Sequence, residues 1–83
     1  MNNYEEDNHK IFVQVTVKFD LEGNVIPLTI IWNDGRFFDI DKILDKRRAA
    51  SLKAGGLGMR YKVRIRGKEF YLFYEEPKWF LEI

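Results

Sequence analysis

Residues 59–66 read Met-Arg-Tyr-Lys-Val-Arg-Ile-Arg, and this stretch decides the fold. Tyr61, Val63 and Ile65 alternate with basic residues, which is the period-two pattern of a β-strand with one apolar and one charged face. Such a strand is stable only within a sheet whose apolar faces cover one another. The rest of the chain must therefore supply further strands.

The flanking sequence contains apolar runs that are separated by turn residues. The other expected strands are residues 11–19, 25–32, 36–44, 70–75 and 79–83. Asn33-Asp34-Gly35 is the strongest hairpin signal, because these residue types tolerate positive φ. Pro27 cannot donate to a ladder, so its strand is expected to start irregularly or at an edge and to pair regularly from Leu28.

Five or six short strands joined mostly by hairpins predict a mostly-β fold. We expect a small antiparallel meander that closes as an SH3-like or OB-like barrel, with one short helix near residues 47–54 ended by Gly55 and Gly56. The alternative is an α+β fold, in which a helix over residues 42–54, capped by Asp41, packs on a curled sheet. Either way, residues 11–83 form a single domain and residues 1–10 a flexible lead-in.

The charge of the chain is strongly asymmetric. Nine of its 14 basic residues and none of its 13 acidic residues lie between Lys46 and Lys68. That window has a formal charge of +9, and the other residues together have −8. This asymmetry points to a polyanionic partner.

The basic side chains are expected to form a nucleic-acid-binding face. Alternate residues of a strand lie about 6.5–7 Å apart on one face, a spacing at which successive phosphates can be met. Guanidinium groups bind phosphate in a forked geometry and also stack on bases. The predicted interface residues are Arg47, Arg48, Lys53, Arg60, Lys62, Arg64, Arg66 and Lys68.

A solvated sheet face that pairs with acids on neighbouring strands would carry the same pattern. Interleaving of the arginines with acidic side chains would favour that structural role; the acids concerned are Asp39, Asp41, Glu69 and Glu75. Aromatic residues also occupy both faces of the strand over residues 70–75. Either one set is exposed beside the basic strand, where bases could stack, or both sets are buried, and burial is the favoured interpretation.

The composition argues against several other kinds of site. The chain has no cysteine, so a disulfide or a thiolate metal site is excluded. Its one histidine, His9, lies in the acidic lead-in without partners for metal binding or proton transfer, and no nucleophile and base pair is present. The glycine-rich segment at residues 51–58 lacks the Gly-Lys-Ser/Thr of a nucleotide-binding loop. We therefore expect neither an enzyme nor a cofactor.

The sequence also bears on location. No stretch approaches the roughly 18 apolar residues of a membrane span, and the polar, acidic start does not resemble a signal peptide. We expect a cytoplasmic protein without membrane contact.

Two stretches resemble short bacterial proteins that are grouped only as a domain of unknown function. They are IIWNDGRFFDIDKILDKRRAASLKAGG (residues 30–56) and RYKVRIRGKEFYLFYEEPKWFLE (residues 60–82). The resemblance implies a free-standing cytoplasmic domain, and it implies no activity and no site residue.

These observations together predict a non-enzymatic binding module that contacts RNA or single-stranded DNA through the basic strand face, with little sequence specificity. The alternative is a protein-interaction or adaptor domain, monomeric or homodimeric, whose basic window docks on an acidic protein surface.

Overall fold

The computed structural model describes residues 10–50 and 57–82 and folds them into one seven-stranded sheet. The strands are β1 (Lys10–Phe19), β2 (Val25–Ile31), β3 (Phe37–Asp39), β4 (Lys42–Ala50), β5 (Leu57–Ile65), β6 (Lys68–Glu75) and β7 (Lys78–Glu82). These residues contain no helix, and the mostly-β class is as predicted. Of the predicted lead-in, only Lys10 is described, and it begins β1.

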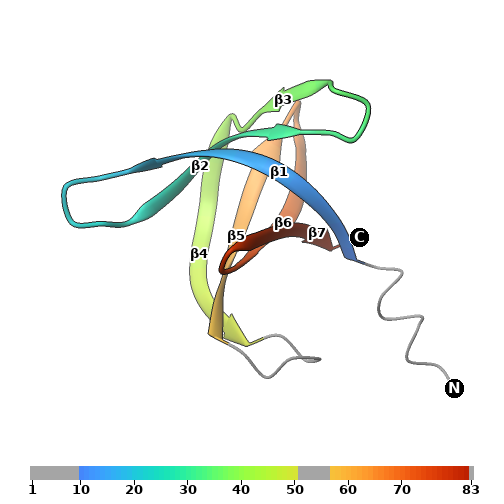
Figure 1. The fold of residues 1–83 in the computed structure, drawn as a ribbon. Helices are drawn as coiled ribbons and strands as arrows, with labels where there is room; N and C mark the ends of the chain where they lie inside the picture. The colour runs from blue at the N-terminus through green and yellow to red at the C-terminus, as the bar shows by residue number, and fades with distance from the viewer. Residues whose placement is uncertain (1–9, 51–56, 83) are drawn as a thin grey trace, which may run out of the picture.

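The sheet is antiparallel throughout and curls into a half-barrel (Figure 1). Its strand order is β3-β2-β1-β7-β6-β5-β4. Because neighbours alternate in direction, the two edge strands β3 and β4 run the same way, and only Ile40 and Asp41 separate them. One bent stretch of chain therefore forms both edges of the sheet.

The bend is held by hydrogen bonds to both arms of the half-barrel. The Ile40 N–H donates to the Leu28 carbonyl of β2 (2.9 Å), and the Asp41 N–H donates to the Arg64 carbonyl of β5 (2.8 Å). The Asp41 carboxylate also accepts a hydrogen bond from the Arg66 N–H (2.9 Å). Adjacent residues thus bind opposite ends of the sheet and keep it curled.

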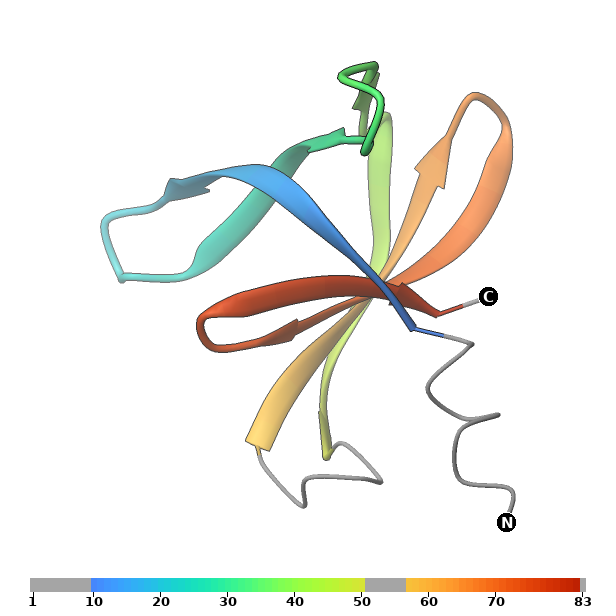
Figure 2. The ribbon, with the colours of Figure 1, turned by 45° about the vertical axis from the view of Figure 1, so that its right-hand side comes forward.

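β1 also passes from one partner to another. Residues 10–13 pair with β7, and residues 14–19 pair with β2. Figures 1 and 2 show the β1–β2 hairpin running across the direction of β4 and β5. The molecule is accordingly elongated, with extents of 42 × 30 × 20 Å.

The apolar core fills the space between the arms of the curled sheet. Its buried residues are Ile30, Tyr61, Val63, Ile65, Leu72 and Trp79. Tyr61 is 1% exposed, and its ring packs against Trp79 with centroids 5.6 Å apart. Its hydroxyl donates to the Val25 carbonyl of β2 (2.8 Å), so one side chain links β5 to the opposite arm.

The predicted helix is wrong for the residues that the structure describes. β4 extends through Ala50 and pairs with β5 from Lys42↔Arg64 to Ala50↔Leu57. A helix here would leave one edge of β5 without backbone partners, and the Asp41 carboxylate that would cap it is bonded to the turn after β5 instead. The remainder of the predicted helix, residues 51–54, lies outside the described part of the chain.

Two turns refine the predicted strand limits. The Asn33-Asp34-Gly35 hairpin is confirmed by the Trp32 N–H, which donates to the Arg36 carbonyl (2.8 Å), and Gly35 has a φ of 91°. The β5–β6 turn has Arg66 (φ 51°) and Gly67 (φ 80°) as its two central residues, with Ile65 paired to Lys68. This turn begins one residue earlier than predicted, so Arg66 leaves the strand and Lys68 joins one.

Pro27 occupies a strand position that demands no N–H donor. It is fully buried and pairs with Val17, and the ladder slips beside it between Thr16 and Val17. β3 pairs only with residues 29–31, so Pro27 has no β3 partner. An irregularity was expected at the start of the strand, before Leu28. It occurs after Pro27, between Pro27 and Thr29, whereas Val25 already pairs regularly with Phe19.

Tyr61→Phe should lower the free energy of unfolding by about 1 kcal/mol, because it removes one buried hydrogen bond and leaves the Val25 carbonyl without that donor. Urea denaturation measures this change. Tyr74→Phe is the matched control: its ring stacks on Trp79 in the same core (4.5 Å), and we expect a change within about 0.5 kcal/mol. Equal losses in both variants would contradict a specific role for the Tyr61 hydroxyl.

The same hydroxyl predicts a pH dependence. Burial, together with the nearby Tyr74, raises the pKa of Tyr61 above its ordinary value of 10.0. The hydroxyl therefore favours the folded state fully below pH 10, and this contribution is lost as pH rises through the raised pKa. Stability should fall more steeply above pH 10 in the wild type than in Tyr61→Phe, and parallel curves would contradict the assignment.

Candidate nucleic-acid interface

The two faces of β5 separate as predicted. Tyr61, Val63 and Ile65 are buried in the core, whereas Arg60, Lys62 and Arg64 point to the opposite, outer face of the sheet and are half-buried. Partial burial of a long basic side chain leaves its charged end able to reach solvent while its stem covers neighbouring side chains. The outer face thus carries a row of three cations at strand spacing.

The strand register places aromatic residues in line with these cations. A transverse row crosses the outer face of five strands, and in order it contains Phe12, Phe80, Phe73, Arg60 and Arg47. The Phe73 and Phe80 rings stack with centroids 5.0 Å apart and an interplanar angle of 4°, and Phe12 meets Phe80 edge-on at 5.6 Å. The row therefore changes from aromatic to basic along its length.

Phe80 is the most buried residue of this row. It is only 2% exposed although it lies on the outer face, because Phe12, Phe73 and the Lys10 ammonium group (4.7 Å from the ring centroid) cover it. Phe12 remains 54% exposed, with the Lys78 ammonium group 5.7 Å from its ring. The aromatic end of the row thus presents one accessible ring beside a cation.

Tyr71 is the aromatic residue closest to the basic end. It lies opposite Lys62 and is 37% exposed, with the Arg60 guanidinium 4.6 Å and the Lys62 ammonium group 6.0 Å from its ring centroid. The favoured interpretation of the sequence, burial of both faces of β6, therefore fails for this residue, since no second layer covers it in the described part of the chain. An exposed ring between cations is a surface on which a base can stack.

Acidic side chains interrupt the basic face at two ion pairs, and the register also places Glu82 directly opposite Tyr71. Lys62 pairs with Glu69 (3.4 Å) and Arg47 pairs with Asp45 (2.9 Å), all with substantial exposure. Exposed pairs of this kind contribute little to stability, typically about 0–1 kcal/mol. Arg60 and Arg64 make no ion pair within the described residues, although Arg64 lies directly opposite Glu69 in the register.

The other acids expected to interleave with the arginines lie elsewhere. Asp39 accepts a hydrogen bond from the Thr29 hydroxyl (3.0 Å), and Asp41 holds the β5–β6 turn. Glu75 is paired with Lys78 in register, at the far end of β6 from Glu69. Of the four acids, only Glu69 forms an ion pair with the basic strand.

The structure brings together four of the eight predicted interface residues on the outer face: Arg47, Arg60, Lys62 and Arg64. Arg48 is paired with Met59 in the adjoining row, which belongs to the opposite face. Arg66 lies in the β5–β6 turn with its guanidinium 4.9 Å from the Phe38 ring, and Lys68 follows that turn. Lys53 lies outside the described residues.

Sequence reasoning missed the residues that β1 and β7 contribute. Phe12, Phe80, Lys10 and Lys78 reach the interface because residues 10–13 pair with β7, a contact between the two ends of the described chain. One signal was available: Phe12 lies in the polar register of its strand, together with Gln14, Thr16 and Lys18. An aromatic residue in a solvent-facing register is a candidate contact residue.

A hollow adjoins the exposed Phe12 ring. β1 leaves β7 after Val13, and the space beside this divergence has a volume of about 690 Å³, with Phe12, Gln14, Pro77 and Lys78 among its walls. This hollow extends the aromatic end of the row and has room for a base or a side chain.

Within residues 10–50 and 57–82, no group of three or more His, Cys, Asp or Glu side chains is placed to hold a metal ion. The same residues include no helix of the length and hydrophobicity that crossing a membrane requires.

Comparison of the chain with protein-family models, curated proteins and solved structures gave no match. The resemblance to bacterial proteins of unknown function thus stays a prediction.

Substitutions on the outer face test whether its cations are structural. Arg64→Gln should change the free energy of unfolding by within about 0.5 kcal/mol, because Arg64 has no ion-pair partner among the described residues. Arg60→Gln should cost about 0.5–1 kcal/mol through its contact with Tyr71. Thermal and urea denaturation measure both. A loss above about 2 kcal/mol in Arg64→Gln would mean that the face is structural.

Proposed function

We propose that the protein is a non-enzymatic, cytoplasmic binding module whose outer face contacts RNA or single-stranded DNA. The observation that carries this proposal is the position of Tyr71, an exposed ring between Arg60 and Lys62. Proteins that bind single strands combine a positively charged surface with aromatic rings on which bases stack, and this face has both.

The arrangement supports contact with a single strand rather than with a duplex. Successive bases can stack only if they are unpaired, and Tyr71 and Phe12 lie in neighbouring rows of the same face. Arg60 and Arg64 supply phosphate contacts at strand spacing. The proposed contacts are to phosphates and to the flat faces of bases, which every sequence offers, so the proposed binding has little sequence specificity.

The proposal also places the half-barrel among small SH3-like or OB-like barrels. The meander order favours the SH3-like type, because OB-like barrels follow a Greek key. The bent stretch β3–β4 and the shared strand β1 support such closure, since each joins the two arms of the sheet.

A protein-interaction domain is the second candidate. The two exposed ion pairs, Lys62–Glu69 and Arg47–Asp45, favour it, because their mixed charges match a mainly acidic protein surface that also carries some basic groups better than they match a row of phosphates. Failure to bind any single-stranded nucleic acid at low salt would leave this candidate, and light scattering would then show whether the partner is a second copy.

Binding to nonspecific RNA or single-stranded DNA is expected at low salt and should weaken steeply between about 50 and 200 mM salt, because counterion release dominates such contacts. Fluorescence anisotropy of a labelled oligonucleotide measures it. Replacing Arg60 and Arg64 together by Gln should make the slope of log affinity against log salt shallower, by about 0.7 for each phosphate that the variant no longer neutralises. An unchanged slope would refute the proposed phosphate contacts.

Stacking on Tyr71 is tested by a pair of substitutions. Tyr71→Ala should weaken binding by about 1–3 kcal/mol, the usual contribution of one stacked base. Tyr71→Phe keeps the ring and should bind nearly as well as the wild type. Equal losses in the two variants would assign the effect to the hydroxyl and contradict stacking.

A further inference from the structure

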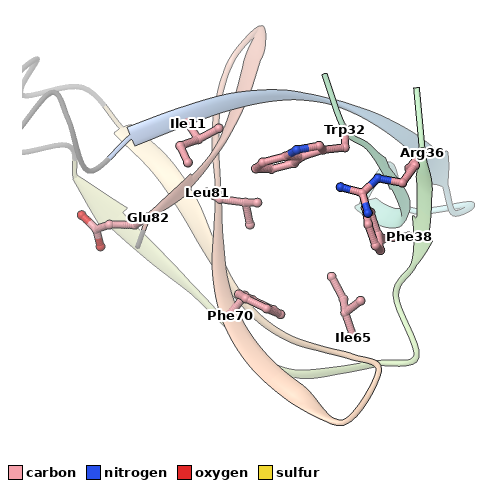
Figure 3. Close-up of a pocket in the computed structure, with 8 residues that line it drawn as sticks. All are labelled: Ile11, Trp32, Arg36, Phe38, Ile65, Phe70, Leu81 and Glu82. Atoms are coloured by element: carbon pink, nitrogen blue, oxygen red, sulfur yellow. The ribbon is translucent and has the colours of Figure 1, made fainter. Parts of the chain in front are cut away.

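A second site lies away from the outer face, in the open end of the half-barrel. Here a pocket of about 340 Å³ is enclosed by side chains from several strands and from the β2–β3 turn (Figure 3). Its lining residues are Ile11, Trp32, Arg36, Phe38, Ile65, Phe70, Leu81 and Glu82. Pockets of this size with mostly apolar and aromatic walls and a few placed polar groups are typical small-molecule sites.

The two charged side chains that line this pocket, Arg36 and Glu82, point in different directions. Figure 3 shows the Arg36 guanidinium above Phe38, reaching toward the indole of Trp32, whereas the Glu82 carboxylate points away from the other seven side chains. Arg36 lies 5.4 Å and Arg66 lies 4.9 Å from the Phe38 ring centroid, so two guanidinium groups contact one wall residue. Two guanidinium groups and one carboxylate, that of Asp34, therefore lie at the rim beside Phe38, while the walls are apolar.

Arg36 is held in place by its own turn. Its Nε donates to the Asp34 carboxylate (2.7 Å), and its N–H donates to the same carboxylate (3.0 Å). This leaves the two terminal NH₂ groups of the guanidinium, which form a planar fork suited to both oxygens of a carboxylate. The Arg36 side chain is 64% exposed, so the pair with Asp34 restricts it only in part and leaves its terminal NH₂ groups open to a ligand.

We propose that this pocket binds a small monocarboxylate with an apolar body, whose carboxylate is held by Arg36 and whose body lies between Trp32, Phe38 and Leu81. At about 30 Å³ per water-sized group, the volume admits roughly eleven non-hydrogen atoms. Two guanidinium groups lie beside Phe38, and Asp34 already pairs with that of Arg36, so the balance of charge suits one further carboxylate better than a dianion against apolar walls. This site is separate from the proposed nucleic-acid interface and does not depend on it.

The two tryptophans provide an internal control for ligand binding. Trp32 lines the pocket, whereas Trp79 is buried against Tyr61 and Tyr74 in the core and does not line it. Titration of the full chain with 3-phenylpropionate, followed by NMR, should therefore shift the indole N–H signal of Trp32 and leave that of Trp79 in place. The matched neutral probe, 3-phenylpropan-1-ol, should bind at least about tenfold more weakly, because it cannot form charge-assisted bonds with the fork.

Substitutions test whether Arg36 is responsible for the preference for the acid over the alcohol. Arg36→Gln should reduce affinity for 3-phenylpropionate by about tenfold or more and abolish the preference for acid over alcohol. Asp34→Asn removes the ion pair of the turn while keeping Arg36 and should retain that preference. Arg60→Gln, on the outer face, should leave carboxylate binding unchanged even though it weakens nucleic-acid binding.

Three results would overturn the proposal: equal affinity for the acid and the alcohol, a shift at Trp79 in place of Trp32, or loss of the acid preference in Asp34→Asn as complete as in Arg36→Gln. The last would assign the effect to the integrity of the turn. If the protein binds the carboxylate but no nucleic acid, the proposed function is refuted and the proposal for this pocket is not.

Discussion

The bend at Ile40 and Asp41 is the constraint on which the rest of the structure depends. Two successive amides donate to carbonyls at opposite ends of the sheet, one in β2 and one in β5. Since only these two residues separate β3 from β4, the two edges of the sheet must lie close together. The sheet therefore curls, the Tyr61 hydroxyl comes within reach of Val25, and Trp32, Phe38 and Ile65 converge on the pocket. The core and the pocket are thus both consequences of one short stretch of backbone.

Curling also gives the two faces of the central strands different environments: the concave face encloses the core, and the outer face lies toward solvent. The concave side is filled by large apolar residues such as Leu72 and Tyr61, so the aromatic residues of the outer side are not required for the core. Phe80 is buried there by its own neighbours on the same face, which makes the outer row a small packed layer exposed to solvent. This layer lies beside Tyr71, whose ring contacts the Arg60 guanidinium at 4.6 Å.

The strands and most turns could be predicted because their signals are local. The alternation around Val63 and the Asn33-Asp34-Gly35 turn specify their own conformations. Residues 47–50 were misjudged because their helix-compatible sequence is overridden by pairing with β5, which is a tertiary effect. Arg60, Lys62 and Arg64 share one face as predicted, since the period of the strand decides this placement. Phe12 had a local signal, its place in the polar register of its strand, but the position of Lys78 and the whole pocket around Arg36 depend on contacts between distant segments that no local pattern encodes.

β4 is an edge strand, and its backbone on the side away from β5 has no strand partner in the described part of the chain. Such an edge can template pairing with a second polypeptide and so lead to aggregation. Three consecutive cations, Lys46, Arg47 and Arg48, and an irregular register between Ile43 and Asp45 occur on this strand. Charges and bulges at an edge disfavour intermolecular pairing, because a second copy would bring like charges together along a distorted ladder. Part of the basic window therefore disfavours aggregation through the β4 edge, independently of any binding function.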